Sequence, residues 1–519
     1  MRIVVCCKLT PNPDRILEED WAQFDPEETY GYAGTDWGCF DQAALEQGLQ
    51  LKEAAAQQGQ TAECIALTVA DHVPAGLAQQ LYAAGYAQVI CLQTSRREFC
   101  PRWVGRQLAE KVKALGADLV LTGAQASHAE TGLVPFWLAD ALDWPIIPDA
   151  EAVSLSAEGL TVQYRKPEGL VQRRLPLPAG ISVGSSPLVL RCATLRARMQ
   201  CRGRQAELCP VTEEPPEDKP VLHRPDTGRA CQQLDGKAAA AQENLLAVIR
   251  AAMHPEGQAV QREAGQTIRF PSVLWAEPCA TGPTQESALL AAYDASHPAL
   301  TLLPDTPEGR RLAVDLATQR QLPCLSHMEI LACDAQQVTL SKRVCSANLE
   351  WACTLQLPAV LTVPPQSKPD IPAESCRVLP GWQDTEPEVL LAPTQITGLD
   401  KAKLVLVCGC GIGSKEACDK VRRLAHALGA GFGLTRPAAL NLWGTPAEIV
   451  GQSGRILAPD CCIVLGAAGA GAFAVGVEHA KTVIAVNTDP EALVFRHADY
   501  GLQMDAAAFA DWLREKLTV

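Results

Sequence analysis

The chain has 519 residues, which corresponds to roughly three domains at about 150 residues each. Hydrophobic residues make up 47% and charged residues 20% of the sequence, a balance that is typical of folded globular proteins and excludes disordered and collagen-like classes. The formal net charge of -14 argues against nucleic acid or an anionic membrane as the main partner. We therefore expect small molecules or other proteins as partners.

Targeting, membrane and metal signals are weak throughout the sequence. The first residues, Met1 to Lys8, lead into an apolar run without the basic region of a signal peptide, so we expect a cytoplasmic protein. The apolar stretch 461–477 is short for a membrane span and is interrupted by glycines, which predicts a buried strand and turn instead. None of the 21 cysteines forms a Cys-x-x-Cys pair, so we predict reduced thiols and no metal site.

The first 210 residues alternate short apolar runs with helical patterns. The helical spacing of 41–56 places Leu45 and Leu49 near one face. Alternating strands and helices predict βαβ units and a parallel sheet, to which antiparallel strands are appended after residue 145. The predicted parallel strands are 3–7, 62–69, 89–92 and 119–122. The predicted appended strands are 160–164, 171–177 and 180–183.

A Pro-, Glu- and Gln-rich segment, 211–268, separates this region from the next, and we predict an interdomain arm with one helix at 238–253. A second, shorter α/β pattern then covers 269–395. The last region, 396–519, begins with a predicted strand at 403–408. A glycine turn follows, and then a helix with Ser414 as its N-cap. Strand, glycine turn and helix together are typical of a nucleotide-binding unit, although the turn alone is a weak signal.

Four segments of the last region, in this order, resemble the FAD-binding domain of the electron transfer flavoprotein α subunit. They are Gly433–Arg436, Val450–Pro459, Ala485–Ala492 and Ala498–Gly501. The first 210 residues resemble the β subunit of the same family. The segments that carry this second resemblance are Ile3–Lys8, Gly38–Asp41 leading into Leu51–Glu53, Leu121–Ala126, Asp143–Pro145 and Ala193–Leu195.

The chain therefore resembles a single-chain fusion with a β-like half first and an α-like half second. The resemblance implies an α/β fold with two lobes that are Rossmann-like, or similar to adenine nucleotide alpha hydrolases, and a C-terminal flavodoxin-like or Rossmann-like FAD-binding domain. The expected domains are the β-like domain 1–210, the arm 211–268, the shortened α-like N-terminal domain 269–395 and the FAD-binding domain 396–519.

The resemblance also implies which residues bind FAD. Thr435 and Arg436 occupy the positions of a Ser-Arg pair whose arginine lies against the isoalloxazine, where a cation favours the reduced, negatively charged flavin. Gln452 and Ser453 match a pair that hydrogen-bonds the flavin, while Asn487 and Asp505 match positions that hold its adenosine and ribitol parts. The full expected set is Thr435, Arg436, Val450, Gly451, Gln452, Ser453, Ala468, Gly469, Ala470, Gly471, Phe473, Asn487 and Asp505.

The β-like half is expected to hold a second nucleotide, either AMP or a second FAD, with an adenine nucleotide slightly favoured. The first strand near Cys6 and the loop from Gly123 to Gly132 match the family's positions for it. The loop carries Ser127-His128-Ala129-Glu130-Thr131-Gly132 where the family has an acidic segment. The expected binding residues are Cys6, Gly123, Gln125, Thr131 and Gly132.

Two departures from the family pattern affect the flavin. The family's Gly-Arg-Gly turn is Gly409-Cys410-Gly411, which removes a cation from the phosphate side. A serine, a glutamine and a histidine of the family are replaced by Ala468, Ala472 and Phe473. Because that histidine normally donates to the flavin, we expect weaker stabilisation of a one-electron-reduced flavin.

The function implied is electron transfer by a redox protein rather than a free-standing enzyme, with no catalytic side chain. Electrons would pass through FAD between this chain and a partner flavin dehydrogenase or reductase, such as an acyl-CoA dehydrogenase-type enzyme. A larger complex with the dehydrogenase stays open. Leu195 matches the family's partner-docking leucine, and five arginines surround it. They are Arg191, Arg196, Arg198, Arg202 and Arg204.

Two alternatives stay open at this point. One is an electron-bifurcating version with two FADs and NADH oxidation. The other is a flavin-free nucleotide-binding scaffold, which the lost serine, glutamine and histidine make plausible.

Overall fold

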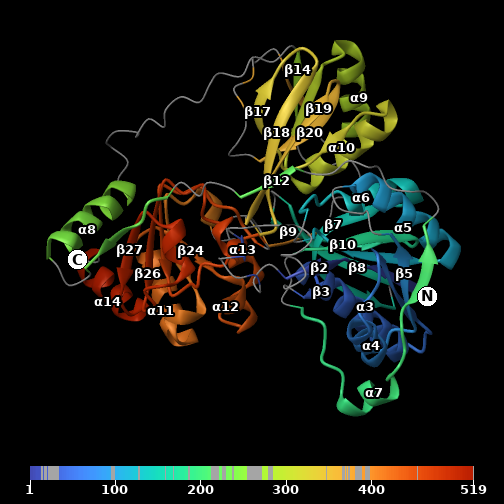
Figure 1. Cartoon of the computed structure of the whole chain (residues 1–519), viewed down its shortest axis with the longest axis horizontal. Coiled ribbons are helices and arrows are strands. Elements are labelled where there is room, and N and C mark those ends of the chain that lie inside the picture. The colour runs from blue at the N-terminus through green and yellow to red at the C-terminus, as the bar shows by residue number, and fades with distance from the viewer. Residues whose placement is uncertain are drawn as a thin grey trace. The chain divides into compact units, whose positions relative to one another are not determined.

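The structure is a computed structural model of the chain (Figure 1), and it divides into two compact units. The first unit comprises Met1–Arg224, Gln266–Cys345 and Leu349–Pro393, and the second comprises Pro225–Gly265, Ser346–Asn348 and Thr394–Val519. The residues that the structure describes are 1–12, 16, 20–21, 34–94, 100–126, 129–157, 159–166, 169–184, 188–211, 221–224, 229–235, 239–253, 272–278, 284–346, 348–364, 369, 371, 375–379, 388–391, 398–452 and 454–517.

A ten-stranded sheet forms the first lobe of the first unit, in the order β11-β5-β4-β1-β6-β10-β7-β8-β9-β22. The strands from β11 to β7 run parallel, and β8, β9 and β22 continue the sheet in antiparallel pairing. Strand bounds are β1 (Arg2–Cys6), β4 (Glu63–Ala70), β5 (Gln88–Gln93), β6 (Leu119–Gly123), β7 (Ile146–Ser156), β8 (Gly159–Lys166), β9 (Gly169–Leu175), β10 (Ala179–Val183), β11 (Glu207–Pro210) and β22 (Glu388–Leu391). A separate pair consists of β2 (Leu9–Pro11) and β3 (Thr35–Trp37).

Helices cover both faces of this sheet, which is why its central strands are apolar throughout. On one face, Leu45 and Leu81 pack against Ile3 and Val5, and on the other Leu108 and Leu138 pack against Val4. The helices of the lobe are α3 (Cys39–Gln57), α4 (Ala75–Ala84), α5 (Pro101–Leu115), α6 (Val134–Leu142) and α7 (Leu195–Gln200). The expected α/β class is therefore confirmed.

One sequence-based expectation for this sheet is wrong. The segment 180–183 was expected to be antiparallel, but β10 runs parallel to both neighbours, pairing Ile181 with Leu121 of β6 and with Ile147 of β7. The chain makes two antiparallel strands, β8 and β9, at the edge and then returns to insert β10 between β6 and β7. Sequence adjacency to β9 therefore does not imply pairing with it.

The second lobe of the first unit pairs a parallel sheet with an antiparallel one. The parallel sheet has the order β16-β20-β15-β14-β21, and the antiparallel sheet has the order β12-β19-β18-β17. Its strands are β12 (Val221–His223), β14 (Val273–Pro278), β15 (Leu300–Pro304), β16 (Cys324–Leu325), β17 (Glu329–Cys333), β18 (Gln337–Val344), β19 (Leu349–Gln356), β20 (Ala359–Val363) and β21 (Cys376–Leu379). Its helices are α9 (Thr284–Ser296) and α10 (Pro307–Arg320).

The two lobes of the first unit repeat one topology. In the first, β10 returns between β6 and β7 after the β8–β9 pair, and in the second, β20 returns between β15 and β16 after the β18–β19 pair. The two return strands also begin alike: Leu-Pro precedes each strand and an alanine is its first residue, at 177–179 and 357–359. An apolar cluster joins the lobes: Phe136 and Trp137 of α6 pack against Val314 and Ala317 of α10.

The second unit contains a six-stranded parallel sheet with the order β13-β27-β26-β25-β23-β24. Its strands are β13 (Gln232–Leu234), β23 (Leu404–Cys408), β24 (Gly431–Leu434), β25 (Cys461–Leu465), β26 (Thr482–Asn487) and β27 (Tyr500–Gln503). Its α-helices are α8 (Ala239–Met253), α11 (Lys415–Ala427), α12 (Arg436–Leu440), α13 (Gly471–Ala474) and α14 (Ala506–Leu517). Its 3-10 turns are η5 (Gly398–Lys401), η6 (Cys410–Ile412), η7 (Pro446–Glu448) and η8 (Leu493–His497).

Part of the segment expected to be an arm contributes to this sheet. Helix α8 buries Leu245 and Ile249 in the same apolar cluster as Leu424 of α11 and Phe509 of α14, and β13 forms the edge strand beside β27. Arg229 fixes the entry of this segment by pairing with Asp499 and donating to the Glu478 carbonyl oxygen at 3.0 Å. The described residues between 229 and 253 therefore belong to the core of the second unit.

Candidate functional site

The residues expected to bind FAD gather at the carboxyl edge of the six-stranded sheet. Thr435 and Arg436 follow β24, Ala468 to Gly471 follow β25, Asn487 ends β26 and Asp505 follows β27. Since all these strands are parallel, their carboxyl ends meet at one edge, which is where open α/β sheets bind ligands. Ser453, which also belongs to the expected set, lies outside the described residues.

Main-chain hydrogen bonds bring the remaining expected residues to this edge. Val450 donates its N–H to the carbonyl oxygen of Leu434 at 2.8 Å, and Gln452 donates to the carbonyl oxygen of Ala472 at 2.7 Å. Gly451 has a φ of +127°, and a Cβ there would lie 2.6 Å from the Ala472 carbonyl oxygen. Only glycine fits this close approach in that conformation.

The glycine turn after β23 has a structural explanation of its own. Gly411 donates its N–H to the Gly466 carbonyl oxygen at 2.8 Å, and a Cβ on Gly409 would lie 2.4 Å from the same oxygen. Two turns, one after β23 and one after β25, therefore pack directly on each other. Cys410 between these glycines is exposed, and its Sγ accepts from Asn441 Nδ2 at 3.5 Å.

Several side chains of the expected set also have local hydrogen-bond partners. Asn487 donates from Nδ2 to the Ala467 carbonyl oxygen at 2.8 Å and accepts at Oδ1 from the Asp489 N–H at 3.0 Å. Asp505 caps α14 by accepting at Oδ1 from the Ala508 N–H at 2.8 Å. These bonds shape the turns, and they leave the second carboxylate oxygen of Asp505 without a partner in the described structure.

Two polar groups at the edge remain available to a ligand. Arg436 is half-buried and forms no ion pair within the part of the chain that the structure describes. The Nε2 atom of Gln452 is buried without a hydrogen-bond partner there, while its Oε1 accepts from the Ser346 hydroxyl at 3.1 Å. Phe473, by contrast, is only 8% exposed and packs in the apolar cluster with Val450. Its ring therefore serves the core.

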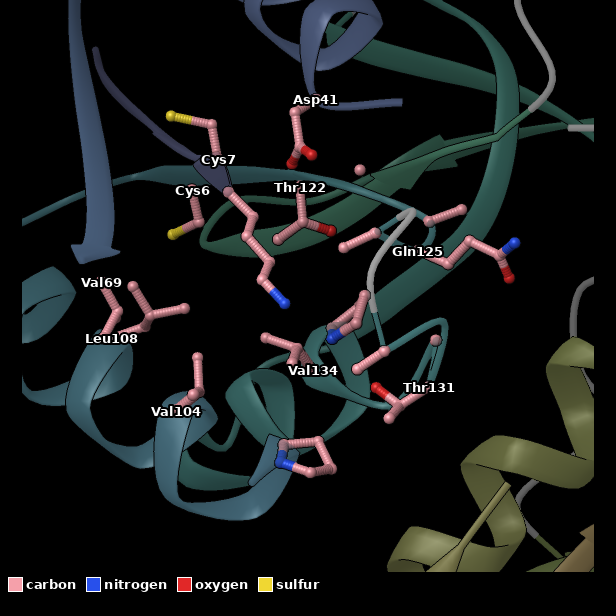
Figure 2. Close-up of a pocket in the computed structure, with 18 of the residues that line it drawn as sticks. Cys6, Cys7, Asp41, Val69, Val104, Leu108, Thr122, Gln125, Thr131 and Val134 are labelled. Atoms are coloured by element: carbon pink, nitrogen blue, oxygen red, sulfur yellow. The ribbon is translucent and has the colours of Figure 1, made fainter. Parts of the chain in front are cut away.

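The first unit contains a pocket at the carboxyl ends of β1, β4 and β6 (Figure 2), with a volume of about 760 Å³ including its open mouth. All five residues expected to hold a second nucleotide line it, namely Cys6, Gly123, Gln125, Thr131 and Gly132. In Figure 2, Val69, Val104 and Leu108 form an apolar side, while Asp41 and Thr122 lie at the opposite, polar side. Ser127 and His128 of the loop lie outside the described residues.

Two buried polar atoms in this pocket have no partner among the described groups. They are Oδ2 of Asp41, in a residue that is 5% exposed, and Oγ1 of Thr122. Burial raises the pKa of Asp41 to about 7, although main-chain N–H groups and Lys8 favour its ionised form. Buried polar groups are almost always hydrogen-bonded, so these two atoms are available to polar groups of a ligand or to water.

Asp41 was missed as a site residue from the sequence alone. It lies in the motif 38–41 used for the resemblance, but an acid in the first turn of a helix is ordinarily explained by the helix dipole. Its burial depends on strands and helices that are distant in sequence. The available indication in the sequence is its place in the first turn of an apolar helix, shortly after β3.

The segment 188–206 carries the expected docking leucine. Leu195 begins α7 and is 77% exposed, and Met199, one turn later, is 60% exposed. Two of the five neighbouring arginines have internal partners: Arg191 pairs with Glu46 and Glu53, and Arg204 stacks over the ring of Tyr82. The other three arginines are exposed, namely Arg196, Arg198 and Arg202. Across the described ranges, none of the helices is both long and apolar enough to cross a membrane.

Two family models and several curated proteins match parts of the chain. Residues 398–478 match the family model of the electron transfer flavoprotein FAD-binding domain, and residues 39–188 match that of the electron transfer flavoprotein domain. Protein FixB of Azorhizobium caulinodans is 29% identical over 295 residues, which cover 52% of this chain and 78% of that protein. A putative electron transfer flavoprotein subunit of Escherichia coli K12, YgcR, is 28% identical over 267 residues, 49% of this chain and 100% of that protein. Protein FixB of Escherichia coli O139:H28 is 30% identical over 218 residues, 40% of this chain and 70% of that protein.

Proposed function

The chain belongs to the electron transfer flavoprotein family, and we propose that it takes electrons from a partner flavin dehydrogenase and passes them on through one FAD at the carboxyl edge of the six-stranded sheet. One observation carries this proposal. Residues from four separate loops that the resemblance assigns to FAD follow the carboxyl ends of parallel strands of one sheet. The match of 398–478 to an FAD-binding domain supports the same site.

The residues at this edge fit FAD. Within the described residues, Gln452 offers a buried Nε2 donor without a hydrogen-bond partner, and Arg436 offers a cation without an ion pair. When bound, FAD supplies the redox chemistry. In this proposal, Arg436 favours the negatively charged reduced form by Coulomb attraction, and Gln452 orients the ring.

The departures from the family pattern should change how readily the flavin accepts one electron or two. Phe473 is buried in an apolar cluster, so it provides neither charge nor a hydrogen bond at the position of the family's histidine. Arg436 therefore supplies the main positive charge toward the flavin. We expect a flavin that is reduced in a two-electron step more readily than in two separate one-electron steps.

A second nucleotide in the pocket of the first unit is part of the proposal. Asp41 Oδ2 and Thr122 Oγ1, which have no partner among the described residues, supply polar contacts, and the apolar side formed by Val69, Val104 and Leu108 suits a planar base. We favour an adenine nucleotide such as AMP. A second FAD in this pocket, together with NADH oxidation, would instead support the electron-bifurcating alternative.

The partner is proposed to be a flavin-dependent dehydrogenase or reductase, of the acyl-CoA dehydrogenase type, that docks on Leu195. The exposure of Leu195 and Met199 supports docking in an apolar pocket of the partner. The segment 188–206 contains no acidic residue in a chain with a net charge of -14, which supports a partner with an acidic rim.

The test is the nucleotide content of the purified full-length protein, measured by absorbance and by mass analysis of the released nucleotides. One FAD, with or without one AMP, supports the simple carrier. Two FADs and direct reduction by NADH would replace it with the bifurcating alternative. A protein that stays free of flavin after reconstitution would overturn both and favour the scaffold alternative.

A further inference from the structure

The loop that lines the pocket of the first unit is held from behind by the second lobe of the same unit. Lys342 of β18 donates from Nζ to the Glu130 carbonyl oxygen at 2.6 Å and to the Ser326 carbonyl oxygen at 3.4 Å. The Ser326 hydroxyl donates to the Thr131 carbonyl oxygen. Glu130 and Thr131 also line the pocket, so the same short stretch of main chain contacts the pocket on one side and the second lobe on the other.

The loop needs such support because of its main-chain conformation. Glu130 has a φ of +52° and Gly132 a φ of +58°, both in the left-handed region. A residue with a Cβ is strained there and keeps that conformation only when its surroundings fix it. The Nζ of Lys342, in a residue that is only 2% exposed, is hydrogen-bonded to the carbonyl group of the strained residue itself.

A second cation lies behind the loop and is fixed by its own partners. A Cβ on Gly132 would lie 2.7 Å from Nη1 of Arg310, so the guanidinium packs directly against this glycine. Arg310 donates from Nε and Nη2 to the two carboxylate oxygens of Asp305, each at 2.8 Å. Asp305 also accepts from the Thr362 hydroxyl at 2.6 Å and lies 2.6 Å from Nδ1 of His327.

We propose that Lys342 is a positioning residue for the nucleotide in this pocket: by holding the Glu130 carbonyl group, it sets the loop 129–132 in the conformation that binds the phosphate-bearing part of the ligand. The inference rests on the nucleotide proposed above for this pocket. Lys342 itself lies behind the loop and does not line the pocket. The second lobe therefore controls a site whose lining residues all come from the first lobe.

Lys342 faces charges from several elements. They are the Glu130 carboxylate on the loop, Asp305 after β15 and Arg310 of α10. His327 pairs with Asp305, and Asp149 of β7 interacts electrostatically with Arg310 and Asp305. Burial lowers the pKa of Lys342 to about 8, against the opposing effect of Glu130 and Asp305. As the pH rises through about 8, Lys342 loses its proton, its hydrogen bond to Glu130 weakens and a positive charge behind the loop disappears. An anionic nucleotide should therefore bind less tightly above pH 8, and by linkage its binding should take up protons near that pH.

The test uses the full-length protein freed of nucleotide, with AMP as the probe and uncharged adenosine as the comparison. We expect Lys342→Met to weaken AMP binding at least tenfold at pH 7 by calorimetry, and to remove the further loss between pH 7 and pH 9. Adenosine should be affected less. The matched control is Lys52→Met: Lys52 also donates to a main-chain carbonyl oxygen, that of Gly85 at 2.6 Å, but it does not line the pocket or contact the loop.

A second variant and a second measurement distinguish positioning of the loop by Lys342 from a general contribution of Lys342 to stability. Lys342→Arg keeps the cation but does not titrate in this range, so it should restore AMP binding at least in part and abolish the pH dependence. Hydrogen exchange of peptides covering 123–132, measured without nucleotide, should be faster in Lys342→Met than in wild type or Lys52→Met.

Two results overturn the inference while leaving the proposed function intact. They are AMP binding in Lys342→Met with the wild-type affinity and pH dependence, and unchanged exchange of the loop. A wild-type protein that binds neither AMP nor FAD in this pocket contradicts both the inference and the second-nucleotide part of the proposed function. The flavin absorbance of the second unit then still tests the electron-transfer proposal separately.

Discussion

Arg191 and Glu46 connect the exposed segment 188–206 to helix α3. The Arg191 guanidinium lies 2.7 Å from Glu46 Oε1, and the main-chain N–H of Arg191 donates to Oε2 of the same carboxylate at 3.1 Å. Glu53, about two turns further along α3, pairs with the same guanidinium, and this hydrogen bond lowers the pKa of Glu53. At the other end of the segment, Arg204 lies 3.6 Å from the ring centre of Tyr82. The segment is thus fixed at both ends while Leu195 between them stays exposed.

Arg191→Ala should loosen this segment. The Glu46 side chain is only 8% exposed, so removing its partner leaves a buried carboxylate and should lower the free energy of unfolding by about 1–3 kcal/mol. Hydrogen exchange of peptides covering 188–206 should become faster. Arg196→Ala, which removes an exposed arginine from the same segment, is the control and should change neither quantity. Equal protection of the segment in both variants would contradict the anchoring role.

Leu195→Ala should slow electron transfer with the partner and leave the flavin unaffected. Because Leu195 is 77% exposed, its removal costs little stability, whereas truncating a docking side chain typically weakens binding about tenfold or more. The measurement is the rate of flavin reduction as a function of the concentration of an acyl-CoA dehydrogenase-type partner. Leu331→Ala, at a leucine of β17 that is 51% exposed, is the control. A loss of rate that is equal in both variants would argue against specific docking.

Ionisation of Asp41 should make the folded protein less stable as the pH rises. Burial raises the pKa of Asp41 to about 7 in the folded protein from the ordinary value of 3.8, so between these values the folded state binds more protons than the unfolded state. Stability should therefore fall as the pH rises from about 4 to about 7 and then level off. Asp41→Asn should remove this fall, with a difference on the order of a few kcal/mol at pH 8 and almost none at pH 4.

Thermal unfolding of nucleotide-free protein from pH 4 to pH 8 measures this effect. Asp511→Asn, at an exposed aspartate of α14, is the control and should leave the wild-type slope unchanged. Parallel curves for wild type and Asp41→Asn would show that the Asp41 carboxyl group ionises normally in the folded protein.

Apolar runs predicted the buried strands and helices well, because a strand that is covered on both faces consists of consecutive apolar residues. The helix predicted at 41–56 is α3 (Cys39–Gln57), and Ser414 caps α11 as expected, accepting from the Ala417 N–H at 3.2 Å. The glycine turn at 409–413 was likewise predicted. Its reason, the close packing of Gly411 on Gly466, depends on a turn more than 50 residues away and is not visible in the local sequence.

Edge strand β13 and the contact of Lys342 with the loop that lines the pocket could not be predicted from local sequence. Strand β13 is three residues long and mostly polar, and it becomes a strand only because β27 offers an unpaired edge. Lys342 looks like an ordinary lysine in an alternating strand, and its burial follows from the packing of the two lobes. The repeat of Leu-Pro-Ala at 177–179 and 357–359 was the available sign that the lobes share a topology.

Arg436→Ala should make the flavin harder to reduce without displacing it. Since Arg436 has no ion pair within the described residues, its removal should not unfold the sheet edge, but it takes away a positive charge that favours the reduced flavin. We expect the reduction potential to fall on the order of several tens of millivolts. Arg436→Lys should restore part of this difference. A potential that is unchanged in Arg436→Ala would mean that the side chain does not face the flavin.

Gly411→Ala should displace a main-chain turn at the FAD site. A Cβ at this position would lie 2.6 Å from the Gly466 carbonyl oxygen, so the turn after β23 or the turn after β25 must move. Because both partners are main-chain atoms, we expect a loss of about 1–3 kcal/mol in the free energy of unfolding and a lower flavin content after purification. The control is Gly76→Ala in α4, where a Cβ meets no atom within 4 Å and should be neutral or slightly stabilising. A Gly411→Ala protein with wild-type stability and full flavin content would show that the two turns can separate without affecting the site.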